Sequence, residues 1–214
     1  MDKITIINRS LSRIGCRPIQ SETSPGPAGI GVVLTYDAIL EDLLSKYPWH
    51  FTTRFAALSR LTETPPLGWT YAFLLPPGRL ALPRAYFESA SDNRPLSRFQ
   101  LSEHKVFTKT EALFAEFQVT PPVAHWPGYF RELVTLCVAA EYALEIREEP
   151  SLRDRLRRDA YGPPEYQGDG GQFKVAADLD AQAGASKQPA GGRNPLSDIR
   201  EGYSADDARN GWDW

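Results

Sequence analysis

Apolar residues recur at steps of three and four along three stretches of the chain, which places them on one face of an α-helix. The stretches cover about residues 3–15, 30–46 and 126–148. Pro48 lies just beyond the second stretch and Pro150 just beyond the third, and proline cannot continue a helix. These patterns predict three amphipathic helices that bury their apolar faces against one another.

Two shorter helical patterns follow the third helix. Residues 151–160 and about 172–184 have helical spacing, and the segment 161–171 between them is rich in glycine and proline. We interpret this segment as a local insertion between two short helices.

Between the second and third helices the apolar period changes from about 3.6 residues to two, which is typical of β-strands. Trp69, Tyr71 and Phe73 alternate with smaller side chains, and residues 113–119 alternate with one clearly apolar face. We therefore expect a small antiparallel sheet or hairpin inserted over about residues 69–119. The tryptophans expected in the folded core are Trp49, Trp69 and Trp126.

The predicted fold class is α+β and mainly α: an antiparallel helical bundle with an inserted small antiparallel β-sheet or hairpin, followed by an extended C-terminal tail. The body covers about residues 1–186 and the tail residues 187–214. Glycine and proline near this boundary favour a flexible linker. The tail is polar and acidic, yet it carries apolar and aromatic residues that are typical of anchors for a binding partner. These candidate anchors are Leu196, Ile199, Tyr203, Trp212 and Trp214.

The charge of the chain argues against a protein that wraps nucleic acid. The net charge is -3 and the isoelectric point is near 5.7. The only basic cluster has acidic residues mixed into it and consists of Arg153, Arg155, Arg157 and Arg158. A solvated or inter-subunit face of ion pairs is therefore favoured over a DNA-facing surface, which stays the open alternative.

No motif predicts catalysis, a cofactor or a metal site. The three histidines, His50, His104 and His125, lie in separate predicted elements and in no catalytic spacing. Asp178 and Asp180 resemble the start of a calcium loop, but the glycine and the final glutamate of such a loop are absent. We therefore expect both aspartates to be solvated helix positions. The protein is predicted not to be an enzyme and to bind no cofactor.

Other segments resemble known signals only in part. The glycines of residues 26–31 follow no strand, which disfavours a dinucleotide-binding loop. The longest uncharged apolar run of the third helix, about residues 133–140, is too short to span a membrane. The N-terminal residues are a poor signal peptide. Cys16 and Cys137 are the only cysteines and lie far apart, which indicates folding in a reducing compartment.

The most specific pattern combines aromatic residues, glycine and proline around the predicted helix–strand corner. It consists of Tyr47-Pro48-Trp49, Gly68-Trp69, Tyr71, Leu75-Pro76, Arg79-Leu80, Pro121 and Trp126-Pro127. The pattern resembles the head-to-tail adaptors of tailed phages, that is, the tail tubular protein A family of podoviruses and its relatives. The resemblance covers about residues 1–148. Beyond them the family has one last long helix, whereas residues 161–171 interrupt the helical pattern of this chain.

The resemblance implies a structural virion protein. Such a protein forms a ring, commonly of twelve copies, that docks under the portal protein and is continued by a tail tube or nozzle protein. Genomic DNA passes through the lumen of the ring without sequence recognition, and no membrane is involved. The C-terminal segment reaches into the portal. The protein would assemble in the cytoplasm of the bacterial host and reside in the neck of the virion. The alternative class is a small DNA-binding or tail-assembly accessory protein of a phage.

Overall fold

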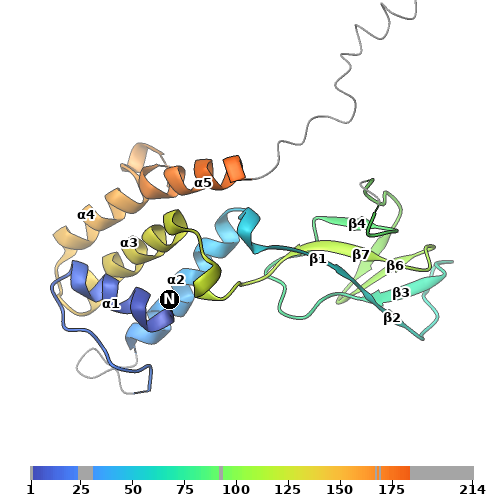
Figure 1. Ribbon diagram of the computed structural model, residues 1–214, viewed down its shortest axis with the longest axis horizontal. Coiled ribbons are helices and arrows are strands. Elements are labelled where there is room, and N and C mark those ends of the chain that lie inside the picture. Colours follow the sequence, from blue (N-terminus) through green and yellow to red (C-terminus); the bar gives the residue numbers. More distant parts are fainter. Residues whose placement is uncertain (1, 24–30, 92–93, 167, 169, 184–214) are drawn as a thin grey trace, which may run out of the picture. The chain divides into compact units, whose positions relative to one another are not determined.

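The computed structural model describes residues 2–23, 31–91, 94–166, 168 and 170–183. The chain divides into two units, residues 1–183 and residues 184–214. All helices and strands of the described residues lie in the first unit, in which two helices precede the strands and three follow them (Figure 1).

Among the described residues five α-helices pack together, with α3 as their central member. Their bounds are α1 Lys3–Arg13, α2 Gly31–Lys46, α3 Gly128–Glu145, α4 Pro150–Tyr161 and α5 Gly171–Ala183. α3 contacts each of the other four helices. It can do so because apolar side chains occur on most of its surface, and 11 of its 18 residues are buried.

A few polar side chains fix the ends and the contacts of these helices. The Asp2 carboxylate caps the start of α1 by accepting a hydrogen bond from the Thr5 N–H (3.0 Å). The buried Ser10 hydroxyl of α1 lies 3.1 Å from the Thr135 carbonyl oxygen of α3. The Tyr142 hydroxyl of α3 donates to the Val32 carbonyl of α2. Each contact satisfies a polar group that burial would otherwise leave without water.

The strands form two antiparallel sheets. The bounds of the strands are β1 Thr53–Ala57, β2 Ser59–Leu61, β3 Tyr71–Leu74, β4 Ala85–Phe87, β5 Gln100–Ser102, β6 Lys105–Thr108 and β7 Phe114–Gln118. The first sheet has the order β1-β7-β4 and the second the order β2-β3-β6-β5. Side chains of both sheets share one apolar core, to which Tyr86 and Phe117 contribute from the first sheet and Phe73 and Val106 from the second.

The prediction of a helical bundle with one small inserted sheet or hairpin is therefore wrong. The described residues contain two sheets with seven strands, and the strands begin at Thr53 instead of about residue 69. The missed strand is one extended segment that leaves the first sheet at Leu58 and enters the second. Four of the five residues of β1 are exposed, so its sequence lacks the apolar alternation that reveals a half-buried strand.

The prediction for the tryptophans is correct for two and wrong for the third. Trp49 and Trp126 are buried among the helices. Trp69 is only partly buried and precedes β3 instead of heading it. Its indole N–H donates to the side-chain carbonyl of Gln100 (2.7 Å). Gly68, with a φ of 76°, turns the chain directly before Trp69, which places the ring at the end of the sheet.

Candidate functional site

The corner between α2 and β1 contains the residues Tyr47-Pro48-Trp49 and connects the helices to the sheets. α2 ends at Lys46, and a short 3₁₀ helix, η2 (His50–Thr52), leads into β1. Trp49 is completely buried, and its indole N–H donates to the Leu43 carbonyl of α2 (2.9 Å). The rings packed around it, at centroid distances of 4.7 to 5.9 Å, are those of Tyr47, Phe130 and Phe173.

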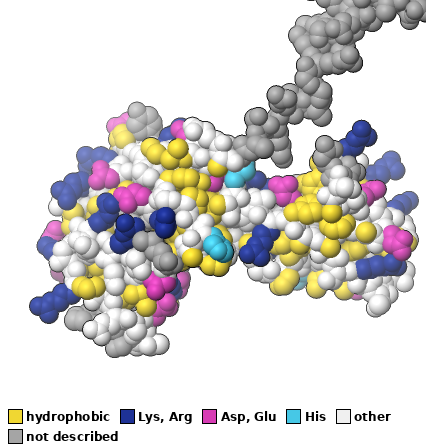
Figure 2. Space-filling model, in the orientation of Figure 1, with side chains coloured by type: hydrophobic (Ala, Val, Ile, Leu, Met, Phe, Trp, Pro, Cys, Tyr) yellow, Lys and Arg dark blue, Asp and Glu magenta, His cyan; other side chains and the backbone are white. Residues whose placement is uncertain are grey.

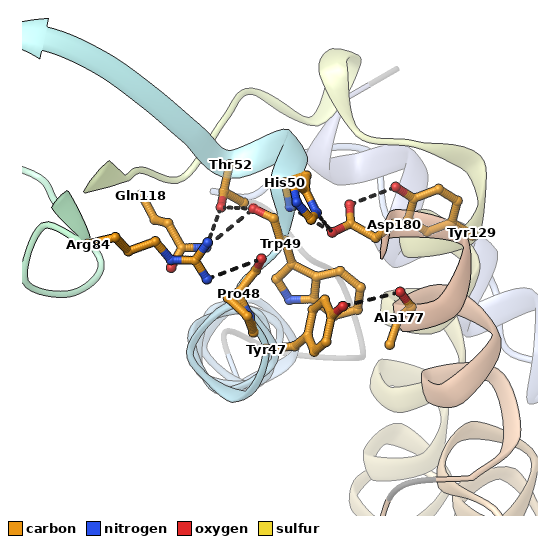
Figure 3. Close-up of polar contacts among 10 residues, drawn as sticks. All are labelled: Tyr47, Pro48, Trp49, His50, Thr52, Arg84, Gln118, Tyr129, Ala177 and Asp180. Carbon is orange, nitrogen blue, oxygen red and sulfur yellow. Dashed lines mark hydrogen bonds and ion pairs between the residues drawn. The ribbon is translucent and has the colours of Figure 1, made fainter. Parts of the chain in front are cut away.

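The same corner is joined to the last strand of the sheets (Figure 3). The Thr52 hydroxyl donates to the Trp49 carbonyl (2.6 Å). The Gln118 side-chain amide, at the end of β7, lies 2.8 Å from the Thr52 hydroxyl oxygen and 3.3 Å from the Trp49 carbonyl oxygen. The Val119 N–H donates to the Thr52 carbonyl (3.0 Å). The two chain segments that connect helices and sheets are thereby fastened to each other.

Asp180 of α5 fastens the corner from the side of the helices. Its carboxylate is completely buried and accepts hydrogen bonds from the His50 N–H (2.7 Å) and the Tyr129 hydroxyl (2.8 Å). The His50 imidazole Nδ1 lies 3.1 Å from the same carboxylate, which requires the proton on Nδ1. Figure 3 shows the side chains of His50 and Tyr129 pointing toward Asp180.

The prediction of a solvated position is therefore wrong for Asp180. Its side chain lies on the inner face of α5, together with Phe173, Ala176 and Ala177. Asp178 lies two residues earlier, where its carboxylate is exposed and pairs with Lys174 at 2.9 Å. No sequence pattern marks the burial of Asp180, because its three donors come from segments that are distant in the chain.

The hydrogen bonds around Asp180 stabilise the fold. A buried carboxylate loses its hydration, and the hydrogen bonds that it accepts replace part of that loss. Burial raises the pKa of Tyr129, and the hydrogen bond to Asp180 raises it further, so the hydroxyl keeps its proton and remains a donor. The arrangement can hold α5 on the corner, because these hydrogen bonds join Asp180 to His50 and Tyr129.

The four candidate arginines lie on α4, and the structure brings two of them to one cavity. Arg157 and Arg158 line a cavity of about 780 Å³ together with Lys46 of α2. Lys46 was not predicted as their neighbour, because α2 and α4 are far apart in the chain. Arg153 and Arg155 are not among the residues that line the cavity.

Acidic groups accompany these cations closely. Arg153 bonds to Asp154 (3.0 Å), and the Arg157 guanidinium lies 3.8 Å from the Glu141 carboxylate of α3. Lys46 pairs with Asp42 at 2.5 Å. Carboxylates of Asp154 and Glu165 also line the cavity. The surface of α4 is consequently a face of mixed charge, as Figure 2 shows for the helical part of the molecule.

The three histidines remain apart. His50 lies in the corner, His104 in the turn between β5 and β6, and His125 in a 3₁₀ segment before α3. The Arg79 guanidinium lies 3.3 Å from Nδ1 of the His104 imidazole. Within residues 2–23, 31–91, 94–166, 168 and 170–183, no group of three histidine, cysteine or carboxylate side chains could hold a metal ion.

The five candidate anchors of the tail, Leu196, Ile199, Tyr203, Trp212 and Trp214, lie outside the described residues. None of the helices in the described part of the chain combines the length and the hydropathy that a membrane span requires. A scan against models of protein families matched none of them, and a search of curated proteins found no match.

Proposed function

We propose that this chain is a head-to-tail adaptor of a tailed phage, a structural protein that forms a ring between the portal and the tail. The observation that carries the proposal is the corner at Tyr47-Pro48-Trp49. These residues belong to the pattern that resembles the adaptor family, and Trp49 is the completely buried residue around which the corner is built. Residues of the pattern that resembles the adaptor family therefore also form the buried core of the corner in this chain.

The mechanics of the corner suit an adaptor. A ring that joins two assemblies has to transmit force between the surfaces that bind them. Two chain segments connect the helices to the sheets, and Thr52 and Gln118 link these segments by hydrogen bonds. Asp180 attaches α5 to the same corner. A connection fastened by several hydrogen bonds suits a protein that transmits force between two partners.

The charge of the chain suits a channel through which DNA moves. A surface that concentrates lysine and arginine binds the phosphate backbone and would hold the DNA in place. The chain has a net charge of -3, and the arginines of α4 are interspersed with carboxylates. A wall of mixed charge allows DNA to pass, and we propose that Arg153, Arg155, Arg157 and Arg158 lie at a subunit contact or face the channel.

A second candidate is a DNA-binding accessory protein of the phage. The cavity lined by Lys46, Arg157 and Arg158 favours it, because three cations could contact phosphate groups there. Binding of duplex DNA by the purified protein, measured at increasing salt, distinguishes the two candidates. A DNA-binding protein would lose affinity steeply with salt and on replacement of Arg158 by serine, whereas an adaptor would bind weakly throughout.

The adaptor proposal is tested by co-sedimentation with purified rings of the cognate portal protein. We expect the full-length chain to sediment with the portal and a variant that lacks residues 196–214 to remain in the supernatant. Replacement of both Trp212 and Trp214 by alanine should weaken the association in the same direction. Undiminished binding of the truncated chain would show that residues 1–195 make the docking contacts. No binding of the full-length chain would contradict the adaptor role.

A further inference from the structure

Within the part of the chain that the structure describes, the outermost strands of the two sheets lie on opposite sides, and of these β4 is partly covered, because its Tyr86 carbonyl accepts a hydrogen bond from the Leu96 N–H (2.7 Å). β1 and β2 are consecutive parts of one strand, joined at Leu58, so they form the edges of both sheets on one side. β4 and β5 form the edges on the other side, where the rings of Tyr86 and Phe99 lie 4.7 Å apart. Each copy of the protein thus has two different edges, at β1 and at β5, that cannot pair with each other within the chain.

The backbone of β1 presents hydrogen-bonding groups to the outside. The Val119 N–H donates to the Thr52 carbonyl and the Leu58 N–H to the Leu113 carbonyl, at the two ends of the pairing between β1 and β7. In an antiparallel pair every second residue bonds to the neighbouring strand. The even-numbered residues of β1 therefore bond to β7, and the N–H and C=O groups of Phe55 and Ala57 point away from it.

The backbone of β5 presents such groups in the same way. The Leu75 N–H donates to the His104 carbonyl, so the even-numbered residues of β6 bond to β3 and the odd-numbered ones to β5. Lys105 is paired with Ser102 across the turn between β5 and β6. Ser102 and Gln100 therefore use their backbone groups within the sheet, and those of Leu101 point outward.

We propose that the β5 edge of one copy adds antiparallel to the β1 edge of a second copy, so that the two sheets continue across the subunit contact. The outward groups set the register: Phe55 lies opposite Leu101, and Ala57 lies opposite Phe99. This inference rests on the ring assembly proposed above and names the contact that would build it.

The side chains fit this register. Residues opposite each other in an antiparallel pair lie on the same face, so Phe55 would cover Leu101, and these side chains are now 46% and 38% exposed. The Phe55 ring already lies 5.6 Å from the rings of Phe87 and Phe114, which would extend the apolar contact.

Three observations favour a second copy as the occupant of the β1 edge. The sequence of β1, Thr-Arg-Phe-Ala-Ala, contains no proline, so every residue of this edge keeps its backbone N–H group. The outward backbone groups and the exposed Phe55 of β1 are matched by the outward backbone groups and the exposed Leu101 of β5 in the same chain. A contact between two different surfaces on opposite sides repeats from copy to copy, as a ring requires. A single short strand pair is weak, and closure of the ring would add the contacts together.

The oligomeric state of the full-length protein in sedimentation velocity tests the proposal. We expect the parent to form oligomers, and Phe55→Lys and Leu101→Lys each to remain monomeric, because each variant blocks one of the two edges. A mixture of the two variants retains one good contact per pair and should give dimers and nothing larger. Leu82→Lys, which changes an exposed leucine outside both edges, is the matched control and should assemble as the parent does.

A backbone variant separates loss of assembly from misfolding. Ala57→Pro removes an N–H group that points away from β7, so the chain should fold with the melting temperature of the parent and still lose assembly. Far-ultraviolet circular dichroism of each variant checks the fold. If the lysine variants were misfolded, the proline variant alone would decide the question.

A covalent test checks the register. Arg54 and Ser102 would form a pair without mutual backbone hydrogen bonds, in which the Cα atoms are about 4.5 Å apart, close enough for a disulfide. The double variant Arg54→Cys and Ser102→Cys, with Cys16 replaced by serine, should form a ladder of oligomers under air oxidation on a non-reducing gel. Each single cysteine variant should form no ladder.

The possible failures are separable. A parent that stays monomeric, lysine variants that assemble like the parent, or the absence of a ladder would overturn the edge contact. Dimers of Leu101→Lys alone would show that β1 pairs with β1. Co-sedimentation with the portal is measured independently, so a parent that forms the ladder but binds no portal would contradict the adaptor role and leave the edge contact standing.

Discussion

At the scale of single residues, Asp180 and Trp49 account for the connection between the helices and the corner. The indole ring of Trp49 fills the space between α2, α3 and α5, and the carboxylate of Asp180 accepts donors from His50 and Tyr129. Burial of the apolar Trp49 ring stabilises the packing of the helices. The Asp180 carboxylate fixes the orientation of α5 at the corner, because hydrogen bonds require a defined geometry. Both residues join α3 and α5 to the corner.

We expect Asp180→Ala to destabilise the protein by roughly 3 kcal/mol, because it leaves the donors at His50 and Tyr129 without their charged acceptor. Chemical denaturation followed by tryptophan fluorescence measures the change. Asp178→Ala, on the same helix but at an exposed carboxylate, is the control and should leave the denaturation midpoint unchanged. Equal effects of the two variants would contradict the role of Asp180.

The Tyr86 hydroxyl is buried and has no hydrogen-bond partner among the described residues. We therefore expect Tyr86→Phe to stabilise the protein by about 1 kcal/mol, since it removes a polar group that lost its hydration without compensation. Tyr142→Phe is the contrasting variant and should destabilise, because the Tyr142 hydroxyl donates to the Val32 carbonyl. Thermal melts compare the two, and a loss of stability in Tyr86→Phe would indicate an unrecognised partner.

Burial raises the pKa of the Cys137 thiol to about 12. The folded state therefore holds the proton more tightly than the unfolded state, in which the thiol ionises near its ordinary pKa of about 9. The resulting stability is fully present below about pH 9 and is lost as the pH rises from about 9 to 12. Denaturation by urea at about pH 8 and about pH 11 should give a lower midpoint at the higher pH, more so in the parent than in Cys137→Ala.

Residue-level prediction from the sequence worked where burial follows from size. Trp49 and Trp126 were expected in the core, and both are buried, since a large apolar ring next to a helical pattern has few other places to go. The prediction failed where a hydrogen-bond partner that is distant in the chain determines whether a side chain is buried. Trp69 stays partly exposed because its N–H bonds to Gln100, and Asp180 is buried because three distant donors meet it.

At the scale of elements, the connection between α4 and α5 is more tightly built than an insertion between two helices suggests. Gly162 and Gly171 approach each other so closely that a Cβ atom on Gly171 would lie 2.7 Å from the Gly162 nitrogen and 2.6 Å from the Asp159 carbonyl oxygen. The Gly170 N–H donates to the Tyr161 carbonyl (2.9 Å). The glycines of this segment allow α5 to start directly beside the end of α4.

We expect Gly171→Ala to destabilise the protein by about 2 kcal/mol or more, because the backbone φ of 53° and both close contacts oppose a side chain. Gly128→Ala at the start of α3 is the control, since a Cβ atom there would have no neighbour closer than 3.9 Å. Denaturation midpoints measure both changes. A tolerated alanine at position 171 would show that the two helices can separate.

The sequence predicts the helices better than the strands for a physical reason. Helical spacing is local, and the patterns at about 3–15, 30–46 and 126–148 correspond to α1, α2 and α3. Strand pairing depends on distant segments, and β1 and β2 have no apolar alternation because most of their side chains are exposed. The second sheet therefore became apparent only in three dimensions.

At the scale of the whole molecule, the adaptor proposal combines three features of the first unit with one of the sequence. The corner holds helices and sheets together, α4 carries mixed charge, and β1 and β5 are outermost strands of the two sheets among the described residues. The apolar and aromatic residues of 196–214 add candidate anchors for the portal. The motif at Tyr47-Pro48-Trp49 led to the proposed function, whereas the edge positions of β1 and β5 could not be inferred without the strand order.

The most direct measurement of the central claim is the mass of the complex that the full-length protein forms with purified portal rings, determined by native mass spectrometry. An adaptor ring should add one discrete mass, with as many copies of this chain as the portal ring has subunits. Free protein should not remain when the two are mixed at equal subunit concentration. A portal ring of unchanged mass, or a broad series of partial occupancies without a closed ring, would contradict the proposal.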